Sequence, residues 1–149
     1  MSAPQVSLRP ARPDDLDFAR RVYYETMRWI IELLFGWDEG REDAKFASQF
    51  FPDQIRIITI DGQDVGWLQA EDTTETVVLK QLYVASSFQR RGIGTRVLTD
   101  LIERARLVGK PMTLSVVKLN PARRLYERHG FRTTHEDKYK FYMRLDGQD

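Results

Sequence analysis

The sequence contains no cysteine. Disulfides, thiolate metal sites and a covalent cysteine intermediate are therefore excluded. The 23 basic and 22 acidic residues leave a formal net charge of +1, which is too small to gather nucleic acid or an anionic membrane surface. No stretch approaches the roughly 20 apolar residues of a spanning helix, and residues 1–10 lack a signal-type apolar run. We therefore expect a cytoplasmic protein with no nucleic-acid or membrane partner.

What the chain does contain is enough for one hydrophobic core. Of its 149 residues, 42% are hydrophobic and 30% are charged, as in an ordinary globular domain. The sequence has no internal repeat and no linker-like segment. We therefore expect residues 1–149 to form a single domain with one site.

Hydrophobic periodicity and turn signals predict an alternation of strands and helices. Gly36 and Gly40 bound the turn between the first two helices, and residues 61–64 have the composition that closes a hairpin. The run at 76–84 is apolar on both faces and is expected at the sheet centre, covered by helices on both sides. The fold class is thus α/β, of the three-layer α+β type with a mixed sheet. The expected strands are 6–9, 55–60, 65–70, 76–84, 112–117, 131–134 and 139–145, and the expected helices are 13–29, 41–50, 95–108 and 120–130.

A glycine-containing segment precedes the third helix. Gly92 and Gly94 stand where the first amide hydrogens of that helix lack partners and attract an anion, and glycine allows close approach and positive φ. Arg90 and Arg91 supply positive charge, and Thr95 supplies a hydroxyl donor. The segment lacks the Gly-Lys-Ser/Thr of a P-loop and the third glycine of a dinucleotide fingerprint. We predict a diphosphate-binding loop, and the alternative is a plain strand-to-helix turn with solvated arginines.

Two stretches carry family motifs. The first is Leu82-Tyr83-Val84 followed by Gln89-x-x-Gly92-x-Gly94, and the second is residues 120–131, NPARRLYERHGF. Together they resemble the acetyl-CoA motifs of the GNAT superfamily of N-acetyltransferases, Q/R-x-x-G-x-G/A and N-x-x-A-x-x-L-Y-x-x-x-G-F. The resemblance implies a central, mixed, mostly antiparallel sheet of six to seven strands flanked by about four helices, with acetyl-CoA as co-substrate. It assigns to acetyl-CoA binding the residues Leu82, Tyr83, Val84, Gln89, Arg90, Arg91, Gly92, Ile93, Gly94, Thr95, Asn120 and Arg123.

Acetyl transfer to an amine needs an unprotonated amine, a stabilised oxyanion and a proton for the departing thiolate. The resemblance places the Tyr126 hydroxyl near the thioester sulfur, so Tyr126 is the predicted general acid; without the motif it would be read as a packing residue. The resemblance also implies oxyanion donors among the backbone amides around Tyr83 and Val84. Asn120 is expected to cap its helix, with Pro121 as the first helical residue, and by resemblance to hydrogen-bond the pantetheine arm.

The general base is not predicted. Relatives carry a glutamate at one of two positions, and this chain has Val78 and Ser115 there. Without a base, turnover would depend on acceptors of low amine pKa or on proton loss to water, and the rate would rise with pH. The remaining carboxylates near the strand entrance or in the helical region are more often solvated surface groups: Glu71, Asp72, Glu75, Glu32 and Glu39.

The acceptor site is expected on the first two helices, which commonly wall it in the family. Trp37 stands between two glycines beside acids, and an indole face attracts an ammonium group. We predict that Trp37, Glu39 and Glu32 contact the acceptor. Aromatic residues at helical spacing are instead expected in the core: Trp29, Phe35 and Phe46.

The leading hypothesis is direct transfer of the acetyl group of acetyl-CoA to a primary amine of a small molecule or peptide, in a ternary complex. Because both glutamate positions are vacant, an acyl-CoA-binding regulatory module with little or no catalysis is the alternative. A nucleic-acid surface made of the arginines at 90, 91, 96, 104 and 106 is disfavoured because Asp100 and Glu103 interrupt it. His129 and His135 accompany no metal motif, so no metal is predicted. A homodimer is common in the family.

Overall fold

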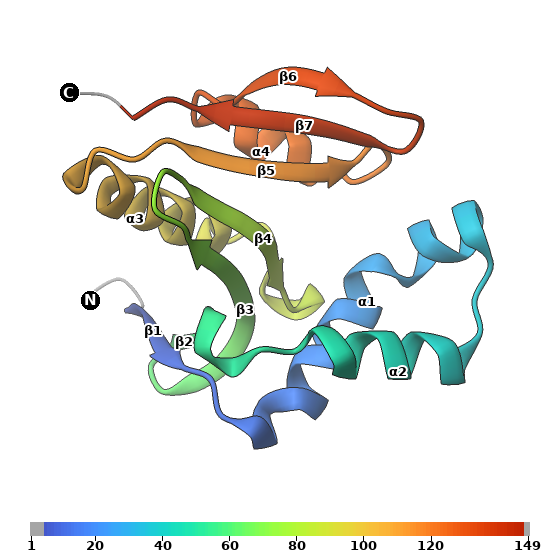
Figure 1. The fold of residues 1–149 in the computed structure, drawn as a ribbon. Helices are drawn as coiled ribbons and strands as arrows, with labels where there is room; N and C mark the ends of the chain where they lie inside the picture. The colour runs from blue at the N-terminus through green and yellow to red at the C-terminus, as the bar shows by residue number, and fades with distance from the viewer. Residues whose placement is uncertain (1–4, 148–149) are drawn as a thin grey trace. The chain divides into compact units, whose positions relative to one another are not determined.

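The computed structural model describes residues 5–147, and its contacts divide the chain into two compact units. Unit 1 comprises the chain up to Gln69 together with Leu82–Ile93, and unit 2 comprises Ala70–Gln81 together with the chain from Gly94 onward. Within residues 5–147, seven strands form one mixed sheet in the order β1-β2-β3-β4-β5-β7-β6, with β4 at its centre, and four α-helices accompany it (Figure 1). The predicted sheet and helix numbers are confirmed.

Unit 1 begins with a strand and two helices and ends in the loop after β4. The predicted hairpin is present between β2 and β3, where Asp61 (φ 49°) and Gly62 (φ 84°) both take the positive φ that a two-residue turn of this kind requires. The elements of unit 1 are β1 (Val6–Pro10), η1 (Pro13–Asp15), α1 (Leu16–Phe35), α2 (Glu39–Gln49), η2 (Pro52–Gln54), β2 (Ile55–Ile60), most of β3 (Gln63–Asp72), the end of β4 (Val77–Val84) and η3 (Ser86–Phe88).

The core of unit 1 forms between α1, α2 and the strands. Trp67 is fully buried and its Nε1 donates to the carbonyl oxygen of Ala19 at 2.9 Å. Phe46 of α2 is buried, as predicted, but Trp29 and Phe35 are 54% and 55% exposed, so their expected place in the core is wrong. Helix α1 continues past Trp29, and both rings lie off its buried stripe. That stripe consists of Ala19, Val22, Met27 and Ile30.

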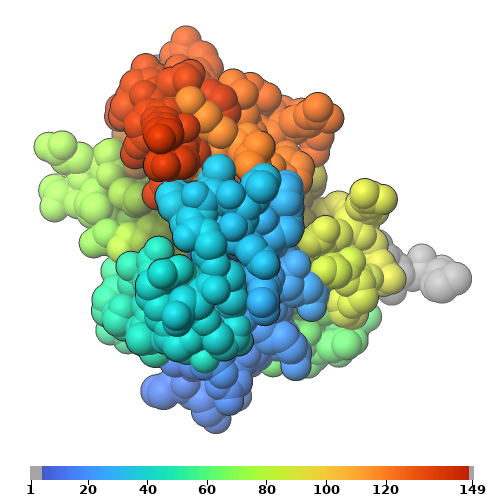
Figure 2. Space-filling view, turned by 90° about the vertical axis from the view of Figure 1, so that its right-hand side faces the viewer, coloured from blue at the N-terminus to red at the C-terminus, as the bar shows by residue number. Residues whose placement is uncertain are grey.

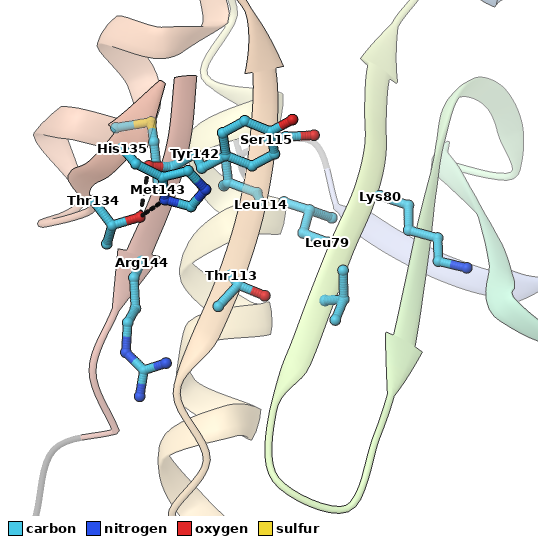
Figure 3. Close-up of a pocket in the computed structure, with 11 residues that line it drawn as sticks. Leu79, Lys80, Thr113, Leu114, Ser115, Thr134, His135, Tyr142, Met143 and Arg144 are labelled. Atoms are coloured by element: carbon cyan, nitrogen blue, oxygen red, sulfur yellow. Dashed lines mark hydrogen bonds between the residues drawn. The ribbon is translucent and has the colours of Figure 1, made fainter. Parts of the chain in front are cut away.

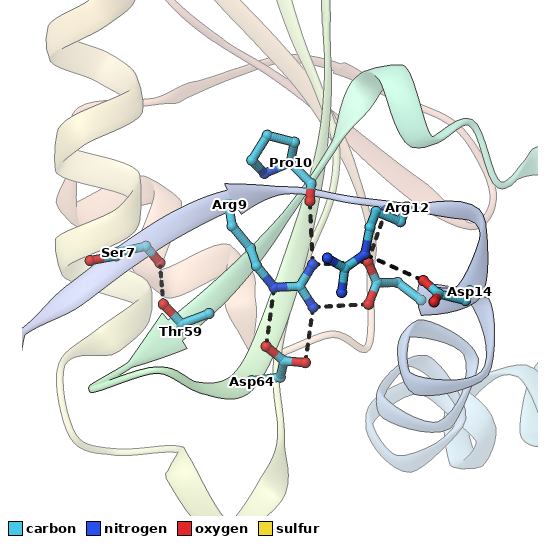
Figure 4. A network of polar contacts seen from close by, with 8 residues as sticks. Ser7, Arg9, Pro10, Arg12, Asp14, Thr59 and Asp64 are labelled. Atoms are coloured by element: carbon cyan, nitrogen blue, oxygen red, sulfur yellow. Dashed lines mark hydrogen bonds and ion pairs between the residues drawn. The ribbon is translucent and has the colours of Figure 1, made fainter.

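A polar network joins the start of α1 to the sheet edge (Figure 4). The Arg9 guanidinium donates to both oxygens of Asp15, at 2.9 and 3.0 Å, and to both oxygens of Asp64, at 3.0 and 3.3 Å. Asp15 is buried, and its hydrogen bond with Arg9 lowers the pKa of that carboxyl. Two-point pairing of this kind fixes geometry as well as charge, so the network holds β1, η1 and β3 together.

Unit 2 packs two helices against its strands. Within it, β4 runs parallel to β5, and β7 pairs antiparallel with both β5 and β6. Met112 lines a small cavity with Ile102 and Ala105 of α3. The buried residues Leu114, Val116 and Met143 share its face of the strands, because Leu114 and Val116 follow Met112 at intervals of two and Met143 pairs with Leu114. Strand side chains alternate between faces, so the intervening residues of β5 and β7 lie on the other side. Unit 2 contains the start of β4, α3 (Ile93–Leu107) from Gly94, β5 (Met112–Val117), α4 (Ala122–Arg128), β6 (Arg132–Glu136) and β7 (Lys140–Leu145).

None of the helices within residues 5–147 has the length and apolar character needed to span a bilayer.

Candidate active site

The loop ahead of α3 has the backbone geometry of an anion-binding loop. Gly92 takes φ 78° and Arg90 takes φ 64°, a conformation that costs a residue with a Cβ about 1–2 kcal/mol and that persists mainly at functional sites. Within the described chain, the exposed N–H groups of Arg91 and Gly92 donate to no protein oxygen. The loop therefore offers unused donors ahead of the positive end of α3.

Side chains of the loop hold its shape. The Nε2 of Gln89 donates to the carbonyl oxygen of Val84 at 2.9 Å, which ties the loop to the end of β4. The Arg91 guanidinium lies over the Phe88 ring, 5.1 Å from its centroid. At the start of α3, Ile93 is buried and Thr95 is exposed. The geometry thus gives Gln89 a structural role and leaves the Thr95 hydroxyl accessible.

Gly94 differs from the prediction. Its φ is not positive, because it lies in the first turn of α3. A Cβ at Gly94 would lie 3.4 Å from Cδ2 of Leu125 in α4, so the missing side chain allows close helix packing. The second positive φ of the loop belongs to Arg90, a position that the glycine pattern could not reveal.

Gly66, which was not predicted from the sequence to be important, lies against the end of β4. A Cβ on Gly66 would lie 2.3 Å from the carbonyl oxygen of Tyr83, so only glycine fits opposite this part of β4. The Tyr83 ring packs between Tyr23 and Trp67, with centroids 5.4 and 5.3 Å away. A lone glycine inside a strand signals close backbone approach, and that signal was present at Gly66.

The second motif forms α4 and its flanks. Asn120 Oδ1 accepts from the N–H of Ala122 at 2.9 Å, but Pro121 is the N-cap of α4 and Ala122 its first residue, so the predicted helix start is one residue early. The Tyr126 ring is 6% exposed and meets the Phe131 ring edge-on, with centroids 5.9 Å apart. Burial raises the pKa of Tyr126 to about 12, which keeps its hydroxyl protonated and able to donate at neutral pH.

Arg123, the last predicted acetyl-CoA contact, packs on β7. Its guanidinium carbon lies 3.7 Å from the centroid of the Phe141 ring, and its Nε lies 3.4 Å from a carboxylate oxygen of Glu127. This Nε is buried and has no hydrogen-bond partner among the described residues. The ring and the carboxylate together fix the direction of the guanidinium.

A groove of about 540 Å³ opens on the side of unit 2 away from α3 and α4 (Figure 3). Within this unit, Leu79 and Leu114 form the last pair of the parallel β4–β5 ladder, and both line the groove. Val78 and Ser115, which stand where the resemblance led us to expect a glutamate, line it as well. The groove therefore begins where β4 and β5 cease to pair, beside Val78 and Ser115.

The carboxylates of Glu71 and Asp72, which precede β4, form ion pairs with lysines. Glu71 pairs with Lys80 at 3.2 Å, and Asp72 pairs with Lys110 at 2.6 Å. Neither carboxylate lines the groove. Among the described residues, no acidic side chain lines the groove.

The predicted acceptor residues lie on α1, on α2 and in the turn between them in unit 1, and these helices form a continuous surface in Figure 2 (blue to cyan). Trp37 donates from Nε1 to Glu39 Oε2 at 2.6 Å, and the Arg28 guanidinium lies 4.7 Å from the centroid of the indole. Arg28 also pairs with Glu32 at 3.4 Å and with Glu39 at 3.7 Å. The structure brings Trp37, Glu39 and Glu32 together around a cation that the chain itself supplies.

Among residues 5–147, no group of three or more His, Cys, Asp or Glu side chains is arranged to hold a metal ion. His129, which the sequence places near a helix end, bonds through Nδ1 to the carbonyl oxygen of Leu125 at 2.9 Å.

Comparison with known proteins gives a family and a fold. The sequence model described as "Acetyltransferase (GNAT) domain" matches residues 51–133, more than half of the chain. A search of curated proteins finds no significant match.

Solved structures of similar fold cover nearly the whole chain. The PaiA N-acetyltransferase of Thermoplasma acidophilum, solved in complex with coenzyme A, is 16% identical with a TM-score of 0.77, over 95% of this chain and 99% of that one. An acetyltransferase of Thermus thermophilus is 19% identical with a TM-score of 0.76, over 98% and 99%. The ribosomal-protein-S18-alanine N-acetyltransferase of Escherichia coli is 19% identical with a TM-score of 0.72, over 97% and 96%. At these identities the likeness concerns the fold.

Proposed function

Because this chain belongs to the GNAT acetyltransferase family, we propose that it transfers the acetyl group of acetyl-CoA directly to a primary amine of a small molecule or peptide, within a ternary complex. Acetyl-CoA is the co-substrate that the family uses. The observation that carries the proposal is the loop before α3, whose free N–H groups at Arg91 and Gly92 suit a diphosphate. The sequence has no cysteine to form an acyl-enzyme through a thiol.

In this proposal the pyrophosphate of acetyl-CoA lies on the loop and the first turn of α3. Arg90 and Arg91 neutralise its charge, and Thr95 adds a hydroxyl donor. From the second motif, Asn120 and Arg123 are proposed to contact the donor. The remaining proposed donor contacts are Leu82, Tyr83, Val84, Gln89, Gly92, Ile93 and Gly94.

Tyr126 is the proposed general acid. The amine nitrogen attacks the thioester carbonyl carbon, the carbon–sulfur bond breaks, and the departing thiolate takes the phenolic proton. The proton lost from the new amide nitrogen restores the phenol. Because burial raises the pKa of Tyr126 to about 12 and a thiol titrates at about 8.5, complete transfer of the phenolic proton is uphill. The hydroxyl therefore works chiefly as a hydrogen-bond donor that loses its proton only as the carbon–sulfur bond breaks.

Trp37, Glu39 and Glu32 remain the proposed contacts of the acceptor. Arg28 occupies the indole face on which a cationic group of the acceptor would bind, so that group must displace it. We expect Arg28→Ala to lower the KM for the amine without changing the KM for acetyl-CoA. An unchanged or raised amine KM would contradict this placement.

The second candidate is an acyl-CoA-binding regulatory module. Val78 and Ser115, which replace the glutamates of relatives, favour it. It would bind acetyl-CoA tightly and acetylate no amine.

Initial rates of thiol release over a panel of amines and peptides separate the two candidates. The transferase predicts amine-dependent release of coenzyme A, with rates that fit a ternary-complex pattern when both substrates are varied. The module predicts calorimetric binding of acetyl-CoA without amine-dependent release. Parallel lines in the double-reciprocal plots would contradict direct transfer.

A further inference from the structure

The groove of unit 2 contains a histidine that the donor and acceptor proposals do not use. The groove is lined by aliphatic, hydroxyl and cationic side chains, and no carboxylate lines it within the described chain. His135 is the imidazole among the lining residues (Figure 3). Histidine is the side chain most often used to move protons in catalysis.

A β-bulge turns His135 into the groove. The pairing of β6 with β7 shifts between Thr133, opposite Met143, and His135, opposite Tyr142. Met143 is buried on the side of α3 and α4, so strict alternation from Thr133 would direct His135 to that same side. The extra residue, Thr134, brings His135 to the opposite side, and bulges are frequent next to active sites because they re-aim a side chain in this way.

The hydrogen bonds of His135 define which nitrogen carries the proton. The Thr134 hydroxyl donates its single hydrogen to the carbonyl oxygen of Tyr142 at 3.2 Å. Its oxygen, 2.9 Å from Nδ1 of His135, must therefore accept from that nitrogen. The neutral imidazole is thus protonated at Nδ1, and its Nε2 keeps the lone pair. Within the described residues Nε2 has no hydrogen-bond partner.

Packing holds the ring in this position. The imidazole stacks on the Tyr142 ring, with centroids 4.4 Å apart and an interplanar angle of 1°. The Tyr142 hydroxyl donates to Asp137 at 2.7 Å, and this bond lowers the pKa of Asp137 and raises that of Tyr142. The ring beneath His135 is therefore tethered, and His135 is constrained from two sides.

His135 shares a cross-strand row with Ser115, because both pair with Tyr142. Adjacent strands lie about 4.8 Å apart, so the His135 backbone is roughly 10 Å from that of Ser115, with Tyr142 between them. The other charged groups on this face belong to β4, β6, β7 and the chain around them: Lys80, Arg132, Asp137, Lys140, Arg144 and Asp146. Of these, Arg144 and Arg132 both pair with Asp146.

We propose that Nε2 of His135 is the general base of the transfer, and that it removes a proton from the acceptor ammonium directly or through one water in the groove of unit 2. The inference rests on the proposed function and adds the base that Val78 and Ser115 do not supply. One proton passes from R–NH3+ to Nε2, which leaves R–NH2 with the lone pair that attacks the thioester. The imidazolium then releases this proton to solvent, so the overall products are the acetylated amine, coenzyme A and one proton.

The tautomer can be tested without an acceptor. In long-range nitrogen–proton NMR spectra of the whole chain above neutral pH, His135 should show protonated Nδ1 and unprotonated Nε2. Thr134→Val removes the oxygen that accepts from Nδ1 and should shift His135 towards the other tautomer. A wild-type His135 protonated at Nε2 would overturn the proposal.

The kinetic test uses His135→Asn, in which the side-chain amide can replace Nδ1 as a donor to Thr134 but has no counterpart of Nε2. At neutral pH we expect kcat/KM for the amine to fall about 100-fold. The deficit should shrink as the pH approaches the pKa of the acceptor amine, because the amine then loses its proton unaided. His129→Asn is the matched control and should keep the wild-type profile. An equal deficit at every pH, or none, would overturn the assignment.

The two proposals fail differently. A wild-type protein that acetylates no amine contradicts the proposed function and, with it, the base. A wild-type protein that turns over but whose pH profile is unchanged in His135→Asn contradicts the base alone. Circular dichroism and acetyl-CoA binding of His135→Asn should match wild type, since the side chain is exposed.

Discussion

At the scale of single residues, Tyr126 shows how packing changes the chemistry that a motif suggests. A motif can specify a tyrosine at this position, but the burial of the Tyr126 ring against Phe131 raises the pKa of its hydroxyl. The phenol is a weaker acid in the fold than in water, so the role that we propose for it in the transfer is chiefly that of a directed hydrogen-bond donor.

Tyr126→Phe removes only the hydroxyl and leaves the packed ring. We expect kcat to fall about 100-fold, while the KM for acetyl-CoA changes little. Steady-state kinetics with a fixed amine measure both constants. An unaffected kcat would remove Tyr126 from the mechanism.

The loop glycine offers a second test at this scale. In Gly92→Ala the new Cβ has open space, but the positive φ of 78° is strained, at a cost of about 1–2 kcal/mol. Gly109→Ala is a matched control, since Gly109 has φ 70° and equally open surroundings after α3. Chemical unfolding should show similar losses for both variants, and calorimetry should show weaker acetyl-CoA binding for Gly92→Ala alone. Equal affinities would contradict the role of the loop.

At the scale of elements, polarity patterns predicted most strands and helices because burial on one side imposes a period. The predicted bounds of 55–60 and 112–117 are those of β2 and β5. The predicted first helix ended at Trp29, but α1 continues to Phe35. Its last turns expose Trp29 and Phe35, so the apolar residues there do not mark the buried side of the helix. The bulge at Thr134 was missed because one inserted residue leaves no trace in hydrophobicity.

Gly66 of β3 allows the backbone at the end of β4 to approach closely. In Gly66→Ala the Cβ would meet the Tyr83 carbonyl oxygen at 2.3 Å, so the strands must separate, and overpacking of this kind costs about 1–3 kcal/mol. We expect a lower free energy of unfolding and a raised KM for acetyl-CoA. Gly40→Ala in α2, where the nearest atom is 3.7 Å from the new Cβ, should leave both unchanged or increase stability slightly. Wild-type values for Gly66→Ala would show that β4 tolerates the added atom.

At the scale of the whole molecule, the family motifs predicted the fold and the donor correctly, since both follow from residues 51–133. The acceptor could not be predicted from those motifs, because it is determined by side chains outside them. The proposed base, His135, could not be predicted either, because its direction depends on a shift in the pairing of β6 with β7 that hydrophobicity does not record.

Buried phenols make the stability of the whole molecule sensitive to alkali. Burial raises the pKa of both Tyr23 and Tyr126 to about 12, whereas an unfolded tyrosine titrates at about 10. The folded state therefore holds these protons more tightly, and their stabilising contribution is complete below pH about 10 and is lost as the pH rises towards about 12. Urea unfolding across this range should show a falling free energy, with a shallower fall in the Tyr23→Phe/Tyr126→Phe double variant. An identical slope in that variant would contradict the burial effect.

The fate of an isotopically labelled acetyl group tests the central claim most directly. Under single-turnover conditions, with labelled acetyl-CoA, excess protein and a panel of amines, mass spectrometry follows the label. Direct transfer predicts that the label leaves acetyl-CoA only when an accepted amine is present, appears on the nitrogen of that amine, and is never found on the protein. Label attached to the protein, or retained in acetyl-CoA with every amine, would contradict the account.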